Sequence, residues 1–214
     1  MEHRVSQVGV LDKSVAVLDA VADAGACSLA DLVVATAQSR ATTHRLAVAL
    51  EAHGLLRRDE AGRFVLGLRL MALGRQAADA WPLAAAAGPV LAALRDETGE
   101  SVQLFVRDGP ERLCVASLES PHELRTIVPL GARLPLSVGS AAQVLREWPV
   151  EGWTESVEER APGVASVSAG ALVDGTVVAV SVSGPIERTT RHPGKRYGAV
   201  VQRTAAQLAA GVTR

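Results

Sequence analysis

The sequence predicts an α+β protein built from two domains, and three observations support this. The chain has 214 residues, which is long for one domain and suits two small ones. Its first third carries three helix-length apolar patterns, followed by two short apolar segments around a turn. The remainder alternates between strand-like and helix-like patterns, which indicates an antiparallel sheet packed with helices.

Composition excludes several classes of protein. The chain is 48% hydrophobic and 21% charged, which is close to globular averages. Cys27 and Cys114 are the only cysteines. Two cysteines are too few for a disulfide framework or a Cys-based zinc site, so we expect two buried thiols. No apolar run reaches the ~18 residues that a bilayer requires, and residues 1–12 do not resemble a signal peptide. We therefore expect a soluble, cytoplasmic protein with no membrane partner.

The first domain is predicted from helix boundary signals. Residues 8–23 carry apolar residues at helical spacing, and Gly25 follows as a stop. Ser28 is a candidate N-cap for a second helix, with Asp31 completing a capping box. That helix ends near residues 36–38. Ser39 then caps a third helix that extends to Gly54.

A hairpin follows the three helices. Two apolar strands flank the turn at residues 59–62, where Gly62 can adopt a positive φ. Three helices and a hairpin in this order form a winged helix-turn-helix. Residues 68–80 continue as a helix that Pro82 interrupts. The predicted domains are therefore a winged helix-turn-helix over 1–70, a linker helix over 71–81 and a second domain over 82–214.

The second domain is predicted to be α+β, with its helices packed on one side of an antiparallel sheet. The expected helices and strands follow from periodicity and from turn residues. Helices are expected over residues 83–98, 137–147 and 195–210, and strands over 101–107, 112–117, 124–129, 164–173 and 177–183.

Charge distribution indicates that the first domain binds DNA. Residues 38–75 contain seven arginines against three acidic residues, although the whole chain has a net charge of −1. Residues near the N-terminus of the third helix would meet base edges in the major groove. The exposed residues predicted to do so are Arg40, Thr42, Thr43 and Arg45, with Leu46 in the core. Ser39 and His44 complete the predicted DNA-binding set, with His44 as a helix-surface or phosphate-facing residue. Arg57, Arg58 and Arg63 on the hairpin would contact phosphates. The alternative is that these arginines only form an ordinary solvent-exposed helical surface and do not contact DNA.

An enzyme is the less favoured class. The five histidines are scattered, with no His-x-x-x-His pair and no cluster of carboxylates of the kind that binds a metal. Ser166 and Ser168 lack the leading glycine of a nucleophile elbow, and no glycine-rich phosphate loop is present. No catalytic residue, metal or cofactor is predicted.

Several motifs resemble the IclR family of bacterial regulators. They are Leu11-Asp12-Lys13-Ser14, the stretch 39–46, Leu55-Leu56-Arg57-Arg58 with residues 62–67, and Val180-Ser181-Val182-Ser183-Gly184-Pro185. The resemblance covers nearly the whole chain. It implies a homodimer or tetramer that binds double-stranded operator DNA, and a GAF-like C-terminal domain that binds a small organic effector. Residues 163–168 and 180–194 most resemble an actinobacterial subgroup tied to amino-acid, particularly leucine, biosynthesis.

The resemblance also implies an effector site. Matching motif by motif places it at Ser140, Ala141, Ser156, Ser166, Ser181 and Ser183. Several relatives carry an acidic residue at the position of Ser156 and a cysteine at the position of Ser166. The ligand of this chain can therefore differ from the ligands of those relatives. Hydroxyls and helix N-terminal amides suit a small carboxylate or an amino acid. The alternative is that Ser181 and Ser183 only pair with neighbouring strands.

Residues 148–151 form a shorter connection than the family normally has at this place. The missing segment normally helps to cover the pocket, so we expect a more open pocket and a feeble or absent response to ligand. A constitutive DNA-binding regulator with a silent sensor domain is therefore the main alternative to a ligand-dependent regulator.

Overall fold

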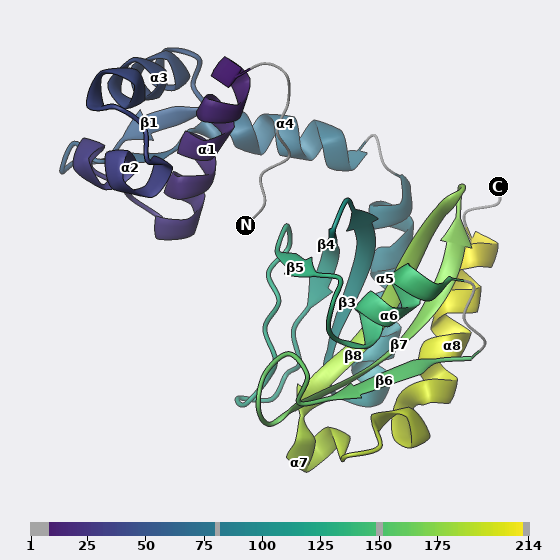
Figure 1. Ribbon diagram of the computed structural model, residues 1–214. Helices are drawn as coiled ribbons and strands as arrows, with labels where there is room; N and C mark the ends of the chain where they lie inside the picture. Colours follow the sequence, from purple (N-terminus) through teal and green to yellow (C-terminus); the bar gives the residue numbers. More distant parts are fainter. Residues whose placement is uncertain (1–8, 80–81, 149–151, 212–214) are drawn as a thin grey trace. The chain divides into compact units, whose positions relative to one another are not determined.

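The computed structural model describes residues 9–79, 82–148 and 152–211. The chain divides into two compact units, Met1–Ala80 and Trp81–Arg214. Each unit has its own buried apolar core. Figure 1 shows the helices and strands of both units.

The first unit contains three helices, a two-stranded hairpin and a fourth helix. These are α1 (Gly9–Ala24), α2 (Leu29–Thr36), α3 (Arg40–Ala52), β1 (Leu56–Arg58), β2 (Phe64–Leu66) and α4 (Leu68–Asp79). The hairpin is antiparallel, with Leu56 opposite Leu66. Val17 and Val21 of α1 pack with Leu32 of α2 and Phe64 of β2, all at most 1% exposed. The predicted winged helix-turn-helix is confirmed.

The predicted helix caps are also confirmed. Ser28 Oγ accepts a hydrogen bond from Asp31 N at 3.2 Å, and Asp31 Oδ2 accepts one from Ser28 N at 2.8 Å. Ser39 Oγ accepts from Thr42 N at 3.2 Å at the start of α3. Because each cap satisfies an amide that the helix leaves unpaired, these side chains fix where α2 and α3 begin.

The second unit contains one six-stranded antiparallel sheet and four helices among its described residues. The elements are α5 (Pro82–Thr98), β3 (Ser101–Asp108), β4 (Glu111–Leu118), β5 (Arg133–Pro135), α6 (Ser140–Glu147), β6 (Thr154–Val157), β7 (Val164–Val173), β8 (Thr176–Pro185), α7 (Ile186–Thr189) and α8 (Pro193–Gly211). The strand order is β5-β4-β3-β8-β7-β6. Both predicted thiols are buried and free, Cys27 in the first unit and Cys114 here.

Side chains alternate across the sheet, and this separates an apolar face from a polar one. On one face, Val167 of β7 and Val180 of β8 pack with Leu91 of α5 and Val201 of α8. The opposite face carries the serines of β7 and β8, and α6 packs there (Figure 1). The prediction that helices cover only one side of the sheet is therefore wrong. The helix α6 begins after Gly139, without a side-chain cap.

The predicted strand over residues 124–129 is also wrong, because that segment is irregular. The carbonyl of Leu124 accepts a hydrogen bond from the Arg188 side chain, and the carbonyl of Val128 accepts one from Ser117 Oγ. Side chains rather than a neighbouring strand therefore satisfy this backbone. Pro129 has no N–H to donate to a ladder. The strand that borders β4 is β5 instead, and the short elements β6 and α7 were not predicted.

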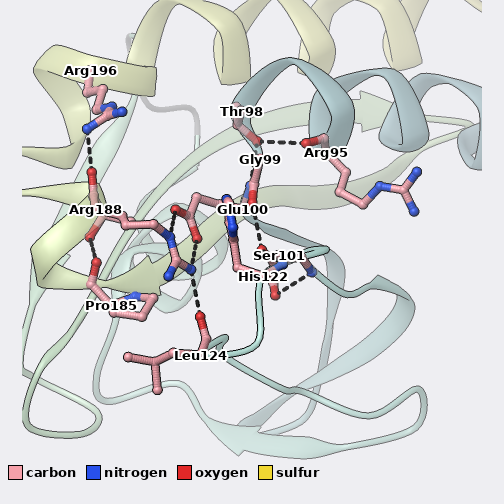
Figure 2. A network of polar contacts seen from close by, with 12 residues as sticks. Arg95, Thr98, Gly99, Glu100, Ser101, His122, Leu124, Pro185, Arg188 and Arg196 are labelled. Atoms are coloured by element: carbon pink, nitrogen blue, oxygen red, sulfur yellow. Dashed lines mark hydrogen bonds and ion pairs between the residues drawn. The ribbon is translucent and has the colours of Figure 1, made fainter.

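A network of hydrogen bonds connects the irregular segment at residues 124–129 to the sheet (Figure 2). The Arg188 guanidinium donates to both carboxylate oxygens of Glu100, at 2.7 and 2.9 Å. The same guanidinium donates to the carbonyl of Leu124 at 2.8 Å. Glu100 is only 1% exposed, and Arg188 is the basic residue that neutralises it. The network thus holds the segment that carries Val128 against the start of β3.

Candidate functional site

The exposed face of α3 is the candidate DNA-binding surface. Helical spacing turns Thr43, Ala47 and Leu50 into the core, which leaves Arg40, His44 and Arg45 exposed on the opposite face. Exposed Ser39 precedes them as the N-cap, and half-buried Thr42 accepts a hydrogen bond from Ser39 Oγ at 2.9 Å. In the part of the chain that the structure describes, neither Arg40 nor Arg45 forms an ion pair or side-chain hydrogen bond. Both guanidinium groups are therefore available to an external acceptor.

The prediction that Thr43 is exposed is wrong. Its side chain is 0% exposed, and its hydroxyl donates to the carbonyl of Ser39 at 3.1 Å. Thr43 lies one helical turn before Ala47, which is also 0% exposed, so both face the core. Thr43 therefore stabilises the start of α3 and does not belong to the DNA-binding surface.

The hairpin between β1 and β2 forms a stiff wing. Asp59 accepts hydrogen bonds from the backbone amides of Ala61 and Arg63, at 3.0 and 2.8 Å. The bond from the Arg63 amide contributes most to lowering the pKa of Asp59. Gly62 lies at the turn with φ 75°, a conformation that favours glycine. The wing's shape is therefore set by local contacts.

The three wing arginines differ in their surroundings. The Arg58 guanidinium lies 4.2 Å from the centre of the Phe64 ring and contacts Glu51 at 3.3 Å. Arg63 pairs with Asp59 at 2.8 Å. Arg57 is exposed and has no ion pair among the described residues. Arg57 is therefore the wing arginine best placed for a phosphate, whereas Arg58 and Arg63 also stabilise the wing.

The described residues offer neither a membrane span nor a metal site. No helix there is both long and apolar enough to cross a bilayer. The same residues contain no group of three or more histidine, cysteine, aspartate or glutamate side chains that could hold a metal ion.

The second candidate site is a cavity between the polar face of the sheet and the start of α6. All six residues predicted for the effector site line it: Ser140, Ala141, Ser156, Ser166, Ser181 and Ser183. Its volume is about 30 Å³. That is room for about two water molecules, since one needs ~10–15 Å³. Whether these residues bind a ligand stays a prediction.

Strand register explains why the serines converge. Ser156 of β6 pairs with Ser166 of β7, which pairs with Ser183 of β8. Residues directly opposite one another on antiparallel strands point to the same face. A row of hydroxyls therefore crosses three strands, and a second row runs from Ser168 through Ser181 to Gln103 of β3.

These hydroxyls bond mainly to one another. Ser140 Oγ, at the start of α6, lies 2.7 Å from Ser166 Oγ and 2.8 Å from Ser168 Oγ. Ser183 Oγ donates to Gln103 Oε1 at 3.0 Å. Ser183 lines the cavity, and its hydroxyl bonds to a neighbouring strand, so the alternative that Ser181 and Ser183 only pair with neighbouring strands stays open.

Sequence reasoning missed both charged residues that line the cavity, Arg160 and, on β4, Arg112. Arg112 is the more informative of the two. It is 3% exposed and lies 5.5 Å from the centre of the Phe105 ring. Its Nη1 donates to the carbonyls of Pro135 and Val138, the latter at 2.8 Å. Burial lowers the pKa of Arg112 to about 10, so the guanidinium remains charged at neutral pH. The available signal was its spacing: two residues before buried Cys114 on the same strand, Arg112 must face the same way.

The backbone at the start of α6 is already partnered. Gly139 N donates to the carboxylate of Glu159 at 2.8 Å. Gly139 has φ 94°, and an added Cβ would lie 3.2 Å from the Arg112 guanidinium. Glycine is thus required both by conformation and by the closeness of Arg112.

The shortened connection falls partly outside the described residues, since residues 149–151 are not among them. Trp148, just before this stretch, lies across Gly170 of β7, where an added Cβ would meet its ring at 2.2 Å. The expectation of a feeble ligand response stays a prediction. In the structure, the small volume of the cavity limits the size of ligand that it can hold.

Two family models match the chain. The IclR helix-turn-helix domain matches residues 10–60, and the bacterial transcriptional regulator IclR C-terminal domain matches residues 75–151. These are families of transcriptional regulators, not of enzymes.

Among similar proteins, the HTH-type transcriptional regulator KipR of Bacillus subtilis is 34% identical over 131 residues, which span 61% of this chain and 52% of KipR. The transcriptional repressor IclR of Escherichia coli is 25% identical over 94% of this chain and 89% of its own. A crystal structure of an IclR homolog from Microbacterium hydrocarbonoxydans, complexed with 4-hydroxybenzoate, has a TM-score of 0.80 at 19% identity, covering 95% of this chain and 98% of that one. At that identity the likeness shows the fold.

Proposed function

Because the chain belongs to the IclR family of DNA-binding transcriptional regulators, we propose that it binds a specific operator and that a small organic effector modulates this binding. The observation that carries the proposal is the exposure of Arg40 and Arg45 at the start of α3, where neither forms an ion pair with another described residue. An arginine there can donate two hydrogen bonds to a guanine in the major groove.

The remaining exposed residues divide by role. Thr42 and His44 would contact bases or phosphates beside Arg40 and Arg45, and the Ser39 hydroxyl would contact the phosphate backbone. Arg57 and, to a lesser degree, Arg58 and Arg63 on the wing would bind backbone phosphates and add salt-dependent affinity without sequence preference.

A homodimer or tetramer would present α3 twice. Two recognition helices would enter successive major grooves about one helical turn apart, ~34 Å. Effector binding would act through the connection that begins with α4 and alter this spacing, with a coupling free energy of about 1–3 kcal/mol. Such a protein acts on chromosomal DNA, in the cytoplasm.

The effector that best fits the cavity is a small carboxylate or an amino acid. The cavity is lined by five serine hydroxyls, Gln103 and a buried arginine, groups that bind oxygen-rich anions. The similar structure from Microbacterium hydrocarbonoxydans was crystallised with a carboxylate, 4-hydroxybenzoate. Amino-acid biosynthesis genes, particularly those for leucine, are the proposed targets, on the resemblance of residues 163–168 and 180–194 to that subgroup.

A constitutive regulator with a silent sensor domain is the second candidate. The short connection at residues 148–151 and the cavity volume of about 30 Å³ favour it. This candidate has the same DNA contacts and differs only in its response to ligand.

Selective capture of genomic DNA tests both candidates. The purified protein would be mixed with genomic fragments at near-physiological salt, with and without a panel of amino acids and small carboxylates, and the retained fragments sequenced. A few sites that share a palindrome and change with one ligand support the ligand-dependent regulator. Enrichment that no ligand changes supports the silent sensor. If no site is enriched, the proposed operator binding is wrong.

A further inference from the structure

Helix α4 is held to the first unit by its first turn. The side chains at residues 71–77 are all exposed, and none of the described residues of α4 belongs to the apolar core of this unit. The helix therefore leaves the core after one turn (Figure 1). Its direction depends on how that turn is attached, and the attachment is to the end of α3.

The backbones of the two helix ends lie in contact. The carbonyl of Gly54, two residues after α3, accepts a hydrogen bond from Arg69 N at 3.3 Å. The carbonyl of Leu55 accepts one from Gly67 N at 2.8 Å. Gly67 is buried, and an added Cβ would lie 2.1 Å from the carbonyl oxygen of Gly54. A glycine at position 67 therefore allows the start of α4 to approach the end of α3 this closely.

The Arg69 side chain adds a bond across this junction. Its Nη1 donates to the carbonyl of His53 at 3.0 Å, and His53 is the C-cap of α3. Within the described part of the first unit Arg69 has no ion-pair partner, so this carbonyl orients its guanidinium. The last carbonyls of a helix lack intrahelical partners, and a cation there also interacts favourably with the helix dipole. A residue of α4 thus caps the C-terminal end of α3.

These contacts join α3 and α4 into one piece. The helix α3 is uninterrupted from Arg40 to Ala52, so the junction lies at one end and the exposed Arg40 and Arg45 lie at the other. Coupling between distant parts of a protein passes through rigid elements that are connected by hydrogen bonds and packing. A change in the direction of α4 therefore turns α3 as a whole. Without the Arg69 bond, the two glycines would leave a junction that bends easily.

We propose that Arg69 is a positioning residue for operator recognition. By bonding to the end of α3 it keeps α3 and α4 rigid relative to one another, and this fixes the spacing of half-sites that a dimer accepts. Two recognition helices keep the separation of successive major grooves, ~34 Å, when each is rigidly joined to the connection that leads to the second unit. The inference rests on the proposed function, because it requires a homodimer that binds a palindrome.

The first test varies the spacing of the operator. The palindrome recovered from genomic fragments would be synthesised with its half-sites one or two base pairs closer or further apart, beside a fragment with a single half-site. We expect the full chain to prefer its own spacing by at least about fivefold, the lower end of coupling between sites. Arg69→Met should reduce this preference to less than about twofold. Its affinity for the single half-site should stay unchanged, because the variant loses rigidity and no DNA contact.

Two further variants control for charge and for folding. Arg107→Met removes an exposed arginine that, like Arg69, donates to a backbone carbonyl, that of Gly109 at 3.1 Å, but lies in the second unit. It should keep the natural spacing preference. Arg69→Lys retains a donor that can reach the His53 carbonyl and should restore most of the preference. Thermal unfolding establishes that each variant folds.

A second measurement examines the junction without DNA. Spin labels on Val48→Cys of α3 and Gln76→Cys of α4, both at exposed positions, would report the distribution of distances between the two helices. Cys27 and Cys114 are 2% and 1% exposed, so they should not be labelled in the folded chain. Labelled chain would be diluted with unlabelled chain, so that each distance comes from one chain. The distribution should be narrow with Arg69 and broader in Arg69→Met.

Three outcomes would overturn the inference. An equal loss of affinity on every spacing and on the single half-site would make Arg69 a phosphate contact instead. An unchanged spacing preference in a folded Arg69→Met variant, or an unchanged distance distribution, would show that the junction is rigid without it. If no palindrome is recovered, the proposed operator binding is wrong, and the spin labels still decide whether Arg69 joins the two helices.

Discussion

Glu100 and Arg188 form a two-bond salt bridge, at 2.7 and 2.9 Å, although 88 residues separate them in the chain. The carboxylate of Glu100 is almost fully buried, and the guanidinium of Arg188 is about a quarter exposed, with a side-chain exposure of 27%. The bridge joins the start of β3 to α7, and through Leu124 it also holds the irregular segment that leads to Val128 at the cavity.

Removing Arg188 should therefore destabilise the second unit strongly. Arg188→Met leaves the Glu100 carboxylate buried without a partner, and the expected loss is about 3–5 kcal/mol of unfolding free energy. The double variant Glu100→Gln, Arg188→Met should recover much of it. Arg203→Met is the control, because Arg203 and Glu97 form a largely exposed pair that contributes at most about 1 kcal/mol. Urea unfolding measures all three, and equal losses for Arg188→Met and Arg203→Met would contradict the prediction.

Gly170→Ala should also be destabilising, because the added methyl would lie 2.2 Å from the Trp148 ring. Overpacking of this kind costs about 1–3 kcal/mol. Combining it with Trp148→Leu should restore part of the loss. Gly88→Ala is the control, since nothing lies within 4 Å of its added Cβ and alanine favours a helix. A stable Gly170→Ala single variant would show that Trp148 can move aside.

The two classes of DNA contact should respond differently to mutation. Arg40→Ala removes a proposed base contact and should cost about 1–3 kcal/mol on the operator while relaxing base preference. Arg57→Ala removes a phosphate contact and should weaken binding to all sequences and flatten the salt dependence. Arg57 is a better residue than Arg58 for this test, because loss of Arg58 would also remove its contacts with Phe64 and Glu51. Binding to operator and random DNA over a salt series measures both. Equal loss for Arg40→Ala on both DNAs would exclude base recognition.

The capping box of α2 should make the first unit sensitive to acid. Hydrogen bonds from the Ser28 hydroxyl, and next from its amide, lower the pKa of Asp31. A lowered folded pKa adds stability above the unfolded value of about 4, and that stability is lost as the pH falls through the folded pKa. The stability difference between the natural protein and Asp31→Asn should therefore shrink as the pH falls below about 4. Asp23→Asn, at an exposed aspartate on α1, serves as control for the loss of one charge. A difference that stays constant with pH would contradict the prediction.

Local signals predicted most of the first unit. The helix caps and the hairpin turn depend on contacts between residues at most four positions apart, so they can be recognised in the sequence. These residues are Ser28 with Asp31, Ser39 and Gly62. Ser166, Ser181 and Ser183 were predicted from the family resemblance, and alternation along β7 and β8 explains why they lie on one face.

What could not be predicted depends on contacts between distant parts of the chain. Thr43 is buried because of how α3 packs in the first unit, which its polar type does not reveal. The partners of Arg112 are carbonyls more than 20 residues away, and those of Gln103 lie on another strand. The segment near Leu124 has a strand-like composition, but Arg188 and Ser117 satisfy its backbone instead.

The cavity is smaller than the ligands that would suit its chemistry, and this can affect kinetics as well as affinity. A space of about 30 Å³ is less than a carboxylate of several heavy atoms occupies, so a ligand of that size requires side chains of the lining to shift. If this shift precedes binding, the observed association rate should level off at high ligand concentration.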